Sequence, residues 1–376
     1  MPISPEPMPA FDAARRIILE QTRCTGSEAV PLEQALGRIL AEDVASDMDM
    51  PPFDKSAMDG YACRRADLQT ELRVIEIIPA GQSPQKEIGS GECSKIMTGA
   101  AVPSGADCVV PVEITRETGN GRIEVTDELT RDNICRQAED IHKGDTVLEK
   151  GTRIDPQHIG VLATVGCTHP LVARQPVVGV ITTGDEIVEP GDTPAPAQIR
   201  NSNGHQLCAQ VQRAGGLPTY YGIVPDTAEA LDAVVKQATE ACDVILLSGG
   251  VSMGDFDLVP GILKQNGFDL LFEKIAVKPG KPTVFGVSEG AFCFGLPGNP
   301  VSTFVIFELL VRPFLEQLMG RDSRPNSWPM QLAAPIRKRD TDRDAWVPVA
   351  VTAPGCVQPI AYHGSAHLNA LAKADG

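Results

Sequence analysis

The sequence predicts an α/β protein of several domains, organised around a doubly wound, mostly parallel β-sheet. Three observations indicate this fold class. The continuous apolar run from Val244 to Leu247 is typical of a strand that is covered on both faces. From Pro176 onward, strand-like and helix-like segments alternate along the chain. Between residues 70 and 150, short β-branched runs separated by glycine and proline indicate a second, β-rich domain.

Length and composition exclude several classes of protein. With 376 residues the chain is long for one hydrophobic core, so we expect about two to four domains. The 33 lysines and arginines against 49 acidic residues give a net charge of −16, which argues against a nucleic-acid partner because phosphate backbones bind basic surfaces. The ten cysteines form no CxxC pair and are expected to be reduced. The chain contains neither a signal-peptide pattern nor a run of about 18 apolar residues, so we expect a cytoplasmic protein without a membrane span.

The first 175 residues are predicted to contain short helices on either side of the β-rich domain. Residues 11–23 and 32–40 carry apolar side chains at helical spacing. The loop from Met48 to Tyr61 combines prolines with charged residues, and on its own it is typical of a solvated linker. Asn120-Gly121 between two β-branched runs predicts a hairpin.

The doubly wound part is expected to alternate strands with helices at 202–214, 227–240 and 258–265. Asp226 has the position of an N-cap for the second helix, with Glu229 three residues later. Pro300 would occupy the first turn of a long apolar helix, which Pro313 should kink or end. The predicted domains are a linking domain at 1–49 and 139–175, the β-rich inserted domain at 50–138, the doubly wound domain at 176–325, and a small C-terminal β domain at 326–376.

The main candidate binding site is the stretch from Ser248 to Asp257. Gly249 and Gly250 allow a tight turn whose N–H groups can hold an anion at the carboxyl end of a parallel sheet. Asp255 and Asp257 follow, and carboxylates beside phosphates suggest a bridging Mg²⁺. An ordinary strand-to-helix turn with solvated acidic residues explains this stretch equally well when it is taken alone.

Lys278 and Lys281 form a second candidate site. They lie in the sequence KPGKP, where the prolines stiffen the loop and bring two ammonium groups within reach of one anion. Surface lysines usually serve solubility, but the prolines and the lack of other nearby cations favour anion binding here.

Seven segments of the chain carry a resemblance to a known family. They are AMDGYA (57–62), IMTGAAVPSGAD (96–107), AEDI (138–141), TTGDE (182–186), SGGVSMGD (248–255), KPGKP (278–282) and LPGNPVS (296–302). Their order resembles that of the molybdopterin molybdenumtransferases, the MoeA family, which is related to the E domain of gephyrin. The similarity covers nearly the whole chain, and seven motifs in order are far more specific than any one of them.

The resemblance implies insertion of molybdate into adenylylated molybdopterin, with Mg²⁺-dependent release of AMP and formation of molybdenum cofactor. It implies a molybdopterin-binding fold for residues 176–325 and a homodimer to which the linking domain contributes. Further candidate partners are the molybdopterin adenylyltransferase and molybdoenzyme maturation proteins. Molybdate and tungstate have nearly the same size and charge, so the sequence does not distinguish the two oxyanions.

The resemblance also assigns site residues. Substrate binding falls to Ser248, Gly249, Gly250, Ser252, Lys278, Lys281, Pro297, Pro300, Ser302, Arg343 and Ser365. Catalytic roles fall to Asp59, Thr98, Asp140, Glu186 and Asp226, and metal binding falls to Glu186 and Asp257. In this assignment Lys278, Lys281, Ser302, Arg343 and Ser365 form the molybdate pocket.

The chain departs from the family pattern at a few positions. Ala138 stands where the family usually has glycine, and Asn201 where an aspartate is common. Pro348 replaces a frequent basic residue, and the C-terminal domain is shorter than the family usually has. Two alternatives remain: a non-catalytic scaffold or binding module on the same fold, and a molybdopterin adenylyltransferase. The retained lysines and carboxylates favour the enzyme over a scaffold, and the long region before Pro176 argues against the adenylyltransferase, which is usually a single domain.

Overall fold

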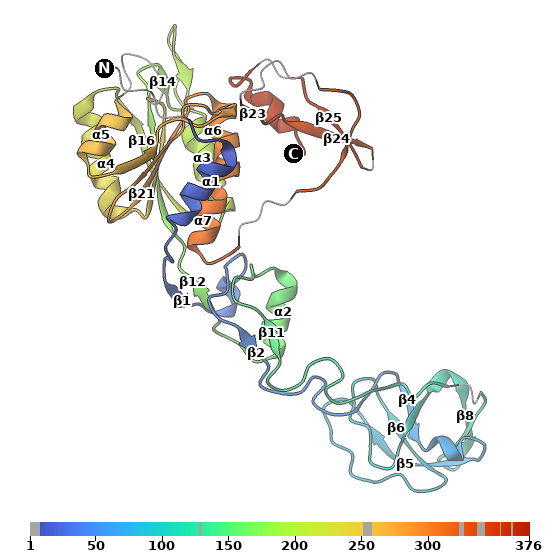
Figure 1. Ribbon diagram of the computed structural model, residues 1–376. Coiled ribbons are helices and arrows are strands. Elements are labelled where there is room, and N and C mark those ends of the chain that lie inside the picture. Colours follow the sequence, from blue (N-terminus) through green and yellow to red (C-terminus); the bar gives the residue numbers. More distant parts are fainter. Residues whose placement is uncertain are drawn as a thin grey trace.

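The computed structural model describes residues 8–127, 130–250, 258–322, 327–336, 343–353, 355–361 and 364–376. The molecule is elongated, with a large sheet domain at one end, a slender stalk in the middle and a β-rich domain at the other end (Figure 1). The C-terminal segment lies beside the sheet domain. Three candidate site residues, Ser252, Asp255 and Asp257, lie outside the described residues.

The sheet domain is built on six strands in the order β16-β13-β17-β21-β20-β18. They are β13 (Val177–Thr183), β16 (Leu217–Val224), β17 (Val244–Ser248), β18 (Asp269–Phe272), β20 (Val284–Val287) and β21 (Phe292–Leu296). Strands β16, β13, β17 and β21 pair in parallel, whereas β20 is antiparallel to both of its neighbours. The prediction of a doubly wound, mostly parallel sheet is confirmed.

Helices cover both faces of this sheet, which explains the continuous apolar run of β17. On one face lie α1 (Phe11–Glu20), α3 (Asn203–Arg213), α6 (Pro300–Ile306) and α7 (Arg312–Leu318); on the other lie α4 (Ala228–Ala241) and α5 (Val259–Gln265). Val244 and Leu246 belong to the first core, and Ile245 and Leu247 belong to the second. Every side chain of the strand is therefore buried, although successive side chains point in opposite directions.

The long helix after β21 does not end at Pro313. It continues from α6 through a π-helical turn, Phe307–Val311, into α7, and Pro313 lies in the first turn of α7. The π turn directly before the proline accommodates its missing N–H, so the chain stays helical up to Leu318.

The stalk consists of two short strand pairs and one helix. Strand β1 (Ser27–Ala29) pairs with β12 (Leu171–Ala173), β2 (Val44–Ala45) pairs with β11 (Thr146–Leu148), and α2 spans Pro156–Thr164. The predicted helix over 32–40 is wrong, because only a 3-10 turn forms at Leu32–Gln34. Gly37 has a φ of +78°, and the residues after it instead pair with the segment 152–154, with Ile39 bridging to Arg153.

An ion pair joins the stalk to the sheet domain. Two guanidinium nitrogens of Arg174 donate to the two carboxylate oxygens of Asp243 at 2.8 and 3.0 Å, and the Val177 amide donates to the same carboxylate at 2.7 Å. Burial opposes ionisation of Asp243, but the hydrogen bonds from Arg174 and Val177 outweigh it and lower its pKa. A third nitrogen of Arg174 donates to the Thr25 carbonyl at 2.9 Å, so one side chain links three segments at the junction.

The β-rich domain contains six strands in the order β7-β4-β6-β5-β9-β8. They are β4 (Gly60–Cys63), β5 (Leu72–Ile78), β6 (Glu92–Ile96), β7 (Cys108–Pro111), β8 (Thr115–Gly119) and β9 (Arg122–Val125). Asn120 and Gly121 connect β8 and β9 with φ angles of +51° and +72°, so the predicted hairpin is confirmed.

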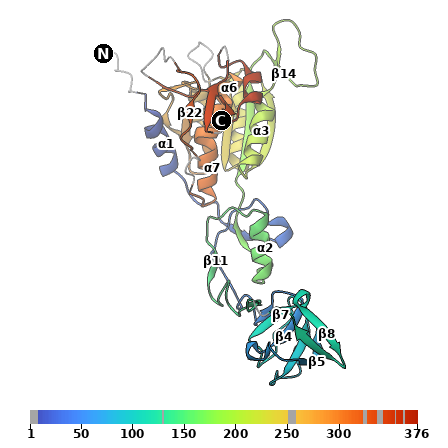
Figure 2. The same cartoon turned by 90° about the vertical axis from the view of Figure 1, so that its right-hand side faces the viewer.

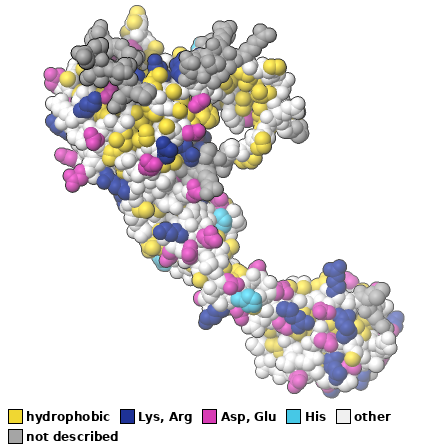
Figure 3. Space-filling model, viewed as in Figure 1, with side chains coloured by type: hydrophobic (Ala, Val, Ile, Leu, Met, Phe, Trp, Pro, Cys, Tyr) yellow, Lys and Arg dark blue, Asp and Glu magenta, His cyan; other side chains and the backbone are white. Residues whose placement is uncertain are grey.

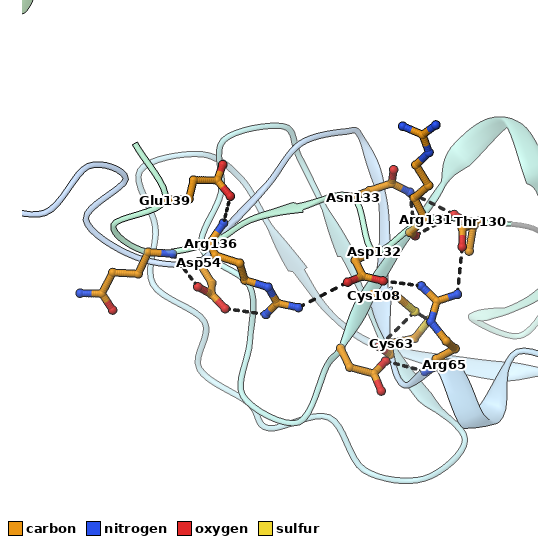
Figure 4. Close-up of polar contacts among 12 residues, drawn as sticks. Asp54, Cys63, Arg65, Cys108, Thr130, Arg131, Asp132, Asn133, Arg136 and Glu139 are labelled. Atoms are coloured by element: carbon orange, nitrogen blue, oxygen red, sulfur yellow. Dashed lines mark hydrogen bonds and ion pairs between the residues drawn. The ribbon is translucent and has the colours of Figure 1, made fainter. Parts of the chain in front are cut away.

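A chain of charged residues fastens the segment that returns from this domain to the stalk (Figure 4). Arg65 contacts Asp132 at 2.8 Å, and Arg136 contacts Asp132 at 3.8 Å and Asp54 at 2.8 Å. The Gln137 amide also donates to Asp54, and this bond together with Arg136 lowers the pKa of that carboxyl. The loop that carries Asp54 is therefore held in place rather than being a free linker.

The C-terminal segment forms a small sheet and adds a strand to the sheet domain. Strands β22 (Gln331–Leu332), β25 (Cys356–Pro359) and β24 (Val349–Ala353) form the small sheet, and β23 (Asp344–Ala345) pairs with β19 (Val277–Lys278). Figure 3 shows hydrophobic side chains gathered on this segment and on the flank of the sheet domain, whereas charged side chains of both signs are scattered over the β-rich end.

The ten cysteines are all free thiols, as the sequence predicts. Five of them are buried: Cys63, Cys93, Cys108, Cys242 and Cys293. Within the described ranges, none of the helices has the length and apolar character needed to cross a bilayer.

Candidate functional site

A cavity of about 680 Å³ lies where the parallel strands of the sheet domain end. Its walls come from the residues that follow β13, β16, β17 and β21, which all end at the same edge of the sheet. Seven predicted site residues line it: Glu186, Asp226, Ser248, Gly249, Gly250, Pro297 and Pro300. The structure therefore brings together residues that are more than 100 positions apart in the sequence.

The turn after β17 requires glycine at position 249. Gly249 has a φ of +103°, and a Cβ placed on it would lie 2.4 Å from the Thr183 carbonyl oxygen of the neighbouring strand. Gly250 also has a positive φ, of +62°. The two glycines let the turn pack closely against the end of β13, and the sequence prediction of a tight glycine turn at this edge agrees with this geometry.

Asp226 is held in the cavity wall by a neighbouring strand and does not cap the following helix. Its carboxylate accepts a hydrogen bond from the Thr183 hydroxyl, and its amide donates to Asp185 at 3.3 Å. The N-cap of α4 is Thr227, whose hydroxyl oxygen accepts from the Ala230 amide at 3.3 Å. The capping role predicted for Asp226 is therefore wrong, and its carboxylate is available to the cavity.

Two asparagines at the start of α3 organise the site, in a region where the sequence pattern indicates only a helix start. Asn203 donates to the Ser248 hydroxyl and to the Gly298 carbonyl, both at 2.8 Å, so it joins the two turns that face each other across the cavity. Asn201 donates to the Thr182 hydroxyl at 3.0 Å and to the Tyr220 hydroxyl at 2.6 Å. The Thr182 hydroxyl already donates to the Gly222 carbonyl at 3.1 Å and the Tyr220 hydroxyl to Glu189 at 2.6 Å, so both oxygens can only accept from residue 201. An asparagine supplies the N–H donors that an aspartate would lack.

The first turn of α6 meets the C-terminal segment at the rim of the cavity. Asn299 donates to the Ser365 hydroxyl at 2.9 Å, and the Val301 amide donates to the Ser365 carbonyl at 3.0 Å. Ser302 lies in the same turn and is 4% exposed. Figure 2 shows the C-terminal segment close to α6, and its 3-10 turn, Leu368–Lys373, contacts that helix. Ser302 and Ser365, which are far apart in the sequence, are thereby brought to one place.

The lysine loop packs against the same helix. Gly280, at a φ of +106°, lies so close to Ile306 of α6 that a Cβ would be 2.4 Å from its side chain. Pro282, next to Lys281, lines the cavity. The Lys278 carbonyl accepts from the Trp346 amide at 2.8 Å, and Arg343 directly precedes the strand that pairs with Lys278. The lysine loop and the contact between Ser365 and the first turn of α6 therefore both adjoin this helix, with Lys278 exposed and Lys281 half-buried.

Three further predicted residues, Asp59, Thr98 and Asp140, lie in or beside the β-rich domain. The amide and the hydroxyl of Thr98 both donate to Asp59 at 2.7 Å, and these bonds lower the pKa of the Asp59 carboxyl. Asp140 lines a separate hollow of about 550 Å³ together with Lys55 and Glu139. Within one chain these residues lie toward the opposite end of the molecule from the sheet cavity (Figure 1).

The cavity offers oxygen ligands of the kind that Mg²⁺ prefers. Glu186 and Asp226 both line it, and Mg²⁺ is commonly held by one or two carboxylates together with substrate phosphates. Among the described residues no group of three or more His, Cys, Asp or Glu side chains is arranged to hold a metal by itself. The residues present therefore fit a metal shared with a phosphorylated ligand.

Comparison with known proteins first defines the class. Residues 179–317 match the family model described as "Probable molybdopterin binding domain", and residues 9–166 match the model of the MoeA N-terminal region, domains I and II. The fold and the cavity are therefore those of a protein with a molybdopterin-binding type of domain joined to a MoeA-type N-terminal region.

Individual relatives of known sequence and structure then give the family. The chain is 40% identical over 321 residues to the molybdopterin molybdenumtransferase of Bacillus subtilis (strain 168), covering 82% of this chain and 74% of the relative. It is 39% identical over 328 residues to that of Staphylococcus aureus (strain N315), covering 84% and 76%. The crystal structure of the molybdopterin biosynthesis MoeA protein of Pyrococcus horikoshii OT3 superposes with a TM-score of 0.84 at 30% identity, covering 98% of this chain and 94% of that one. The chain belongs to the molybdopterin molybdenumtransferase family, also called MoeA.

Proposed function

We propose that this protein inserts molybdate into adenylylated molybdopterin, releases AMP with the help of Mg²⁺, and so forms molybdenum cofactor. One observation carries the proposal: the cavity combines carboxylates and a glycine turn with an adjoining lysine loop. A dianionic oxyanion and a diphosphate need cations and N–H donors, and a metal that bridges phosphates needs carboxylates.

The proposed roles follow from where the side chains lie. Lys278 and Lys281 bind the oxyanion through charge-assisted hydrogen bonds. The hydroxyls of Ser302, in the first turn of α6, and of Ser365, in the C-terminal segment beside that turn, donate to its oxygens. Thr183 holds the Asp226 carboxylate in a fixed orientation toward the phosphates. Mg²⁺ bound by Glu186, with Asp257 as the expected second ligand, would neutralise charge on the phosphates when it is present.

The proposal includes a homodimer in which each site draws on both subunits. Asp59, Thr98 and Asp140 lie in or beside the β-rich domain, and the sheet cavity lies at the far end of the same chain. A symmetric dimer of two elongated chains can bring the β-rich part of one subunit over the sheet domain of the other.

The oxyanion site is tested by Lys281→Gln, with Lys236→Gln as a matched control. Lys236 is an exposed lysine on α4 that pairs with Asp232 at 2.7 Å, on the face of the sheet away from α6. The molybdate concentration needed for half-maximal AMP release should rise about 10- to 100-fold in Lys281→Gln, because a charge-assisted contact is lost. The control should match the parent. Equal molybdate dependence in Lys281→Gln and the parent would contradict the assignment, and a parent without AMP release would favour the scaffold alternative.

A further inference from the structure

Three cysteines lie side by side on neighbouring strands of the β-rich domain, and no predicted role accounts for them. Cys63 ends β4 and lies directly opposite Cys93 of β6 on one side and opposite Cys108 of β7 on the other. All three side chains are 0% exposed and belong to one hydrophobic core. Because directly opposite residues of a sheet project their side chains to the same face, the three thiols form a row.

Cys63 and Cys108 form a close thiol pair within this row. Their Sγ atoms lie 3.8 Å apart, and the Cys108 Sγ lies 3.6 Å from the Cys63 carbonyl oxygen (Figure 4). Directly opposite Cα atoms of antiparallel strands are about 4.5–5.5 Å apart, which lies within the range of about 4.4–6.8 Å that a disulfide spans. Rotation of the two side chains can therefore bring the sulfurs to bonding distance without separating the strands.

The contact between the two thiols makes them chemically unequal. The hydrogen bond between them raises the pKa of Cys63 and lowers the pKa of Cys108. Burial and the Asp107 carboxylate oppose the lowering at Cys108, whereas the Arg65 guanidinium supports it. The thiolate is the reactive form of a thiol, so Cys108 is the one that reacts first with an oxidant, and Cys63 is in place to resolve the product.

The position of β7 at the edge of its sheet gives an oxidant a route to the pair. The outer side of β7 is covered by the segment that returns to the stalk. The Val109 amide donates to the Asp132 carbonyl, and the Asn133 side-chain amide donates to the Val109 carbonyl, both at 2.8 Å. Arg65 holds the same segment through Asp132 at 2.8 Å. Local opening of this cover and of the edge strand exposes Cys108 without unfolding the rest of the sheet.

We propose that Cys63 and Cys108 form a redox modification site, in which hydrogen peroxide converts the two thiols to a disulfide that ties β7 to β4. The Cys108 thiolate attacks one peroxide oxygen, so an S–O bond forms, the O–O bond breaks, and the departing hydroxide takes up the proton that Cys108 released. The Cys63 sulfur then attacks the sulfenic acid, so the S–S bond forms, the S–O bond breaks, and a second water leaves with the Cys63 proton. Two thiols lose two electrons in total, and one peroxide is reduced to two waters.

The disulfide would restrict the strands that follow and face Asp59. Asp59 directly precedes β4, and its carbonyl accepts from the Val112 amide, just after β7, at 3.1 Å. The thiol pair lies at the other end of the same two strands. Because Cys63 and Cys108 are 45 positions apart in the sequence, the link also removes many conformations of the opened chain. The oxidised domain should therefore open less readily than the reduced one, whether or not the proposed function holds.

The test is oxidation of the purified full chain with hydrogen peroxide, followed by peptide mass spectrometry. Free thiols are blocked with N-ethylmaleimide at acidic pH during denaturation, so that disulfides do not exchange. A peptide pair joined through Cys63 and Cys108 should appear, and a thiol reductant should remove it. Cys108→Ala should form no such pair. Cys93→Ala is the matched control and should form the same link as the parent, because both sulfurs of the pair are retained.

Hydrogen exchange measures whether the link ties the two strands. The amides of residues 108–110 should exchange about tenfold or more slowly in the oxidised parent than in the reduced parent, because the edge strand opens less often. The same peroxide treatment should leave their exchange unchanged in Cys108→Ala.

The search for the link in the parent does not depend on the folding of any variant. Oxidation of the exposed Cys24 while Cys63 and Cys108 both remain free thiols would overturn the proposal. A link from Cys63 to Cys93 in place of Cys108 would overturn it as well, since the contact between the sulfurs would then not decide the partner. A link between Cys63 and Cys108 without slower exchange in β7 would contradict the tie between the strands.

Discussion

Replacing Gly249 by alanine should disable the cavity while leaving the rest of the sheet domain folded. The new Cβ would lie 2.4 Å from the Thr183 carbonyl oxygen, whereas ordinary contact begins at 3.4 Å, so the turn and β13 must separate by about 1 Å (3.4 − 2.4). The φ of +103° adds strain of about 1–2 kcal/mol for a residue with a Cβ. Because a displacement of about 1 Å in a reacting site can lower the rate about 100-fold, we expect a loss of AMP release of that order.

Gly298→Ala is the matched control for this prediction. Gly298 lines the same cavity, but its added Cβ would have only one close neighbour, the Gly249 Cα at an ordinary 3.8 Å. The assay is molybdate-dependent AMP release together with the melting temperature of each variant. Gly298→Ala should retain activity within about threefold of the parent, because nothing has to move. If the two variants lost activity to the same extent, the close approach of Gly249 to Thr183 would not be what shapes the site.

Three further predictions concern stability and assembly. Asp243→Asn should lower the free energy of unfolding by about 1–2 kcal/mol near neutral pH. Because the pKa of Asp243 in the folded protein is lowered from 3.8, the difference in melting temperature between variant and parent should shrink as the pH falls below that value. A difference that does not change with pH would contradict this prediction. Ala138→Gly should stabilise the chain by about 0.5–1 kcal/mol in denaturant unfolding. Ala138 has a φ of +60°, which costs an alanine about 1–2 kcal/mol, and the greater conformational entropy of glycine in the unfolded chain offsets only part of the relief. An unchanged or lower denaturation midpoint would refute the prediction. Asp59→Asn and Lys281→Gln proteins should be mixed under subunit exchange at a molybdate concentration too low for Lys281→Gln alone to turn over. About a quarter of the parent activity at that concentration should return, and no recovery despite demonstrated exchange would mean that each site lies within one chain.

The sequence predicts best those features that depend on neighbouring residues in the chain. The apolar run of β17 and the turn at Gly249 and Gly250 follow from local pattern, and so does the hairpin at Asn120-Gly121. They could be predicted because burial on both faces selects apolar residues at every position of a strand, and positive φ angles select glycine or asparagine.

Features that depend on contacts between distant segments were not predictable in the same way. Residues 32–40 have helical spacing, but pairing with segment 152–154 overrides it. Asp226 has the spacing of a cap, yet the Thr183 hydroxyl from the neighbouring strand binds it. Asn203 was missed because only the folded chain shows that it donates to Ser248 and to Gly298 from opposite sides of the cavity. The polar residues Asn201 to Asn203 were the available signal, and the sequence pattern indicated only the start of the helix at 202–214.

The most direct test of the proposed function is the conversion itself. Purified full-length protein is incubated with adenylylated molybdopterin and Mg²⁺, with or without molybdate; AMP is quantified, and the product is offered to a molybdoenzyme that lacks its cofactor. The proposal predicts that AMP and enzyme-activating cofactor appear in equal amounts, and only when molybdate is present. AMP release without activating cofactor, or neither product under saturating molybdate and Mg²⁺, would contradict it.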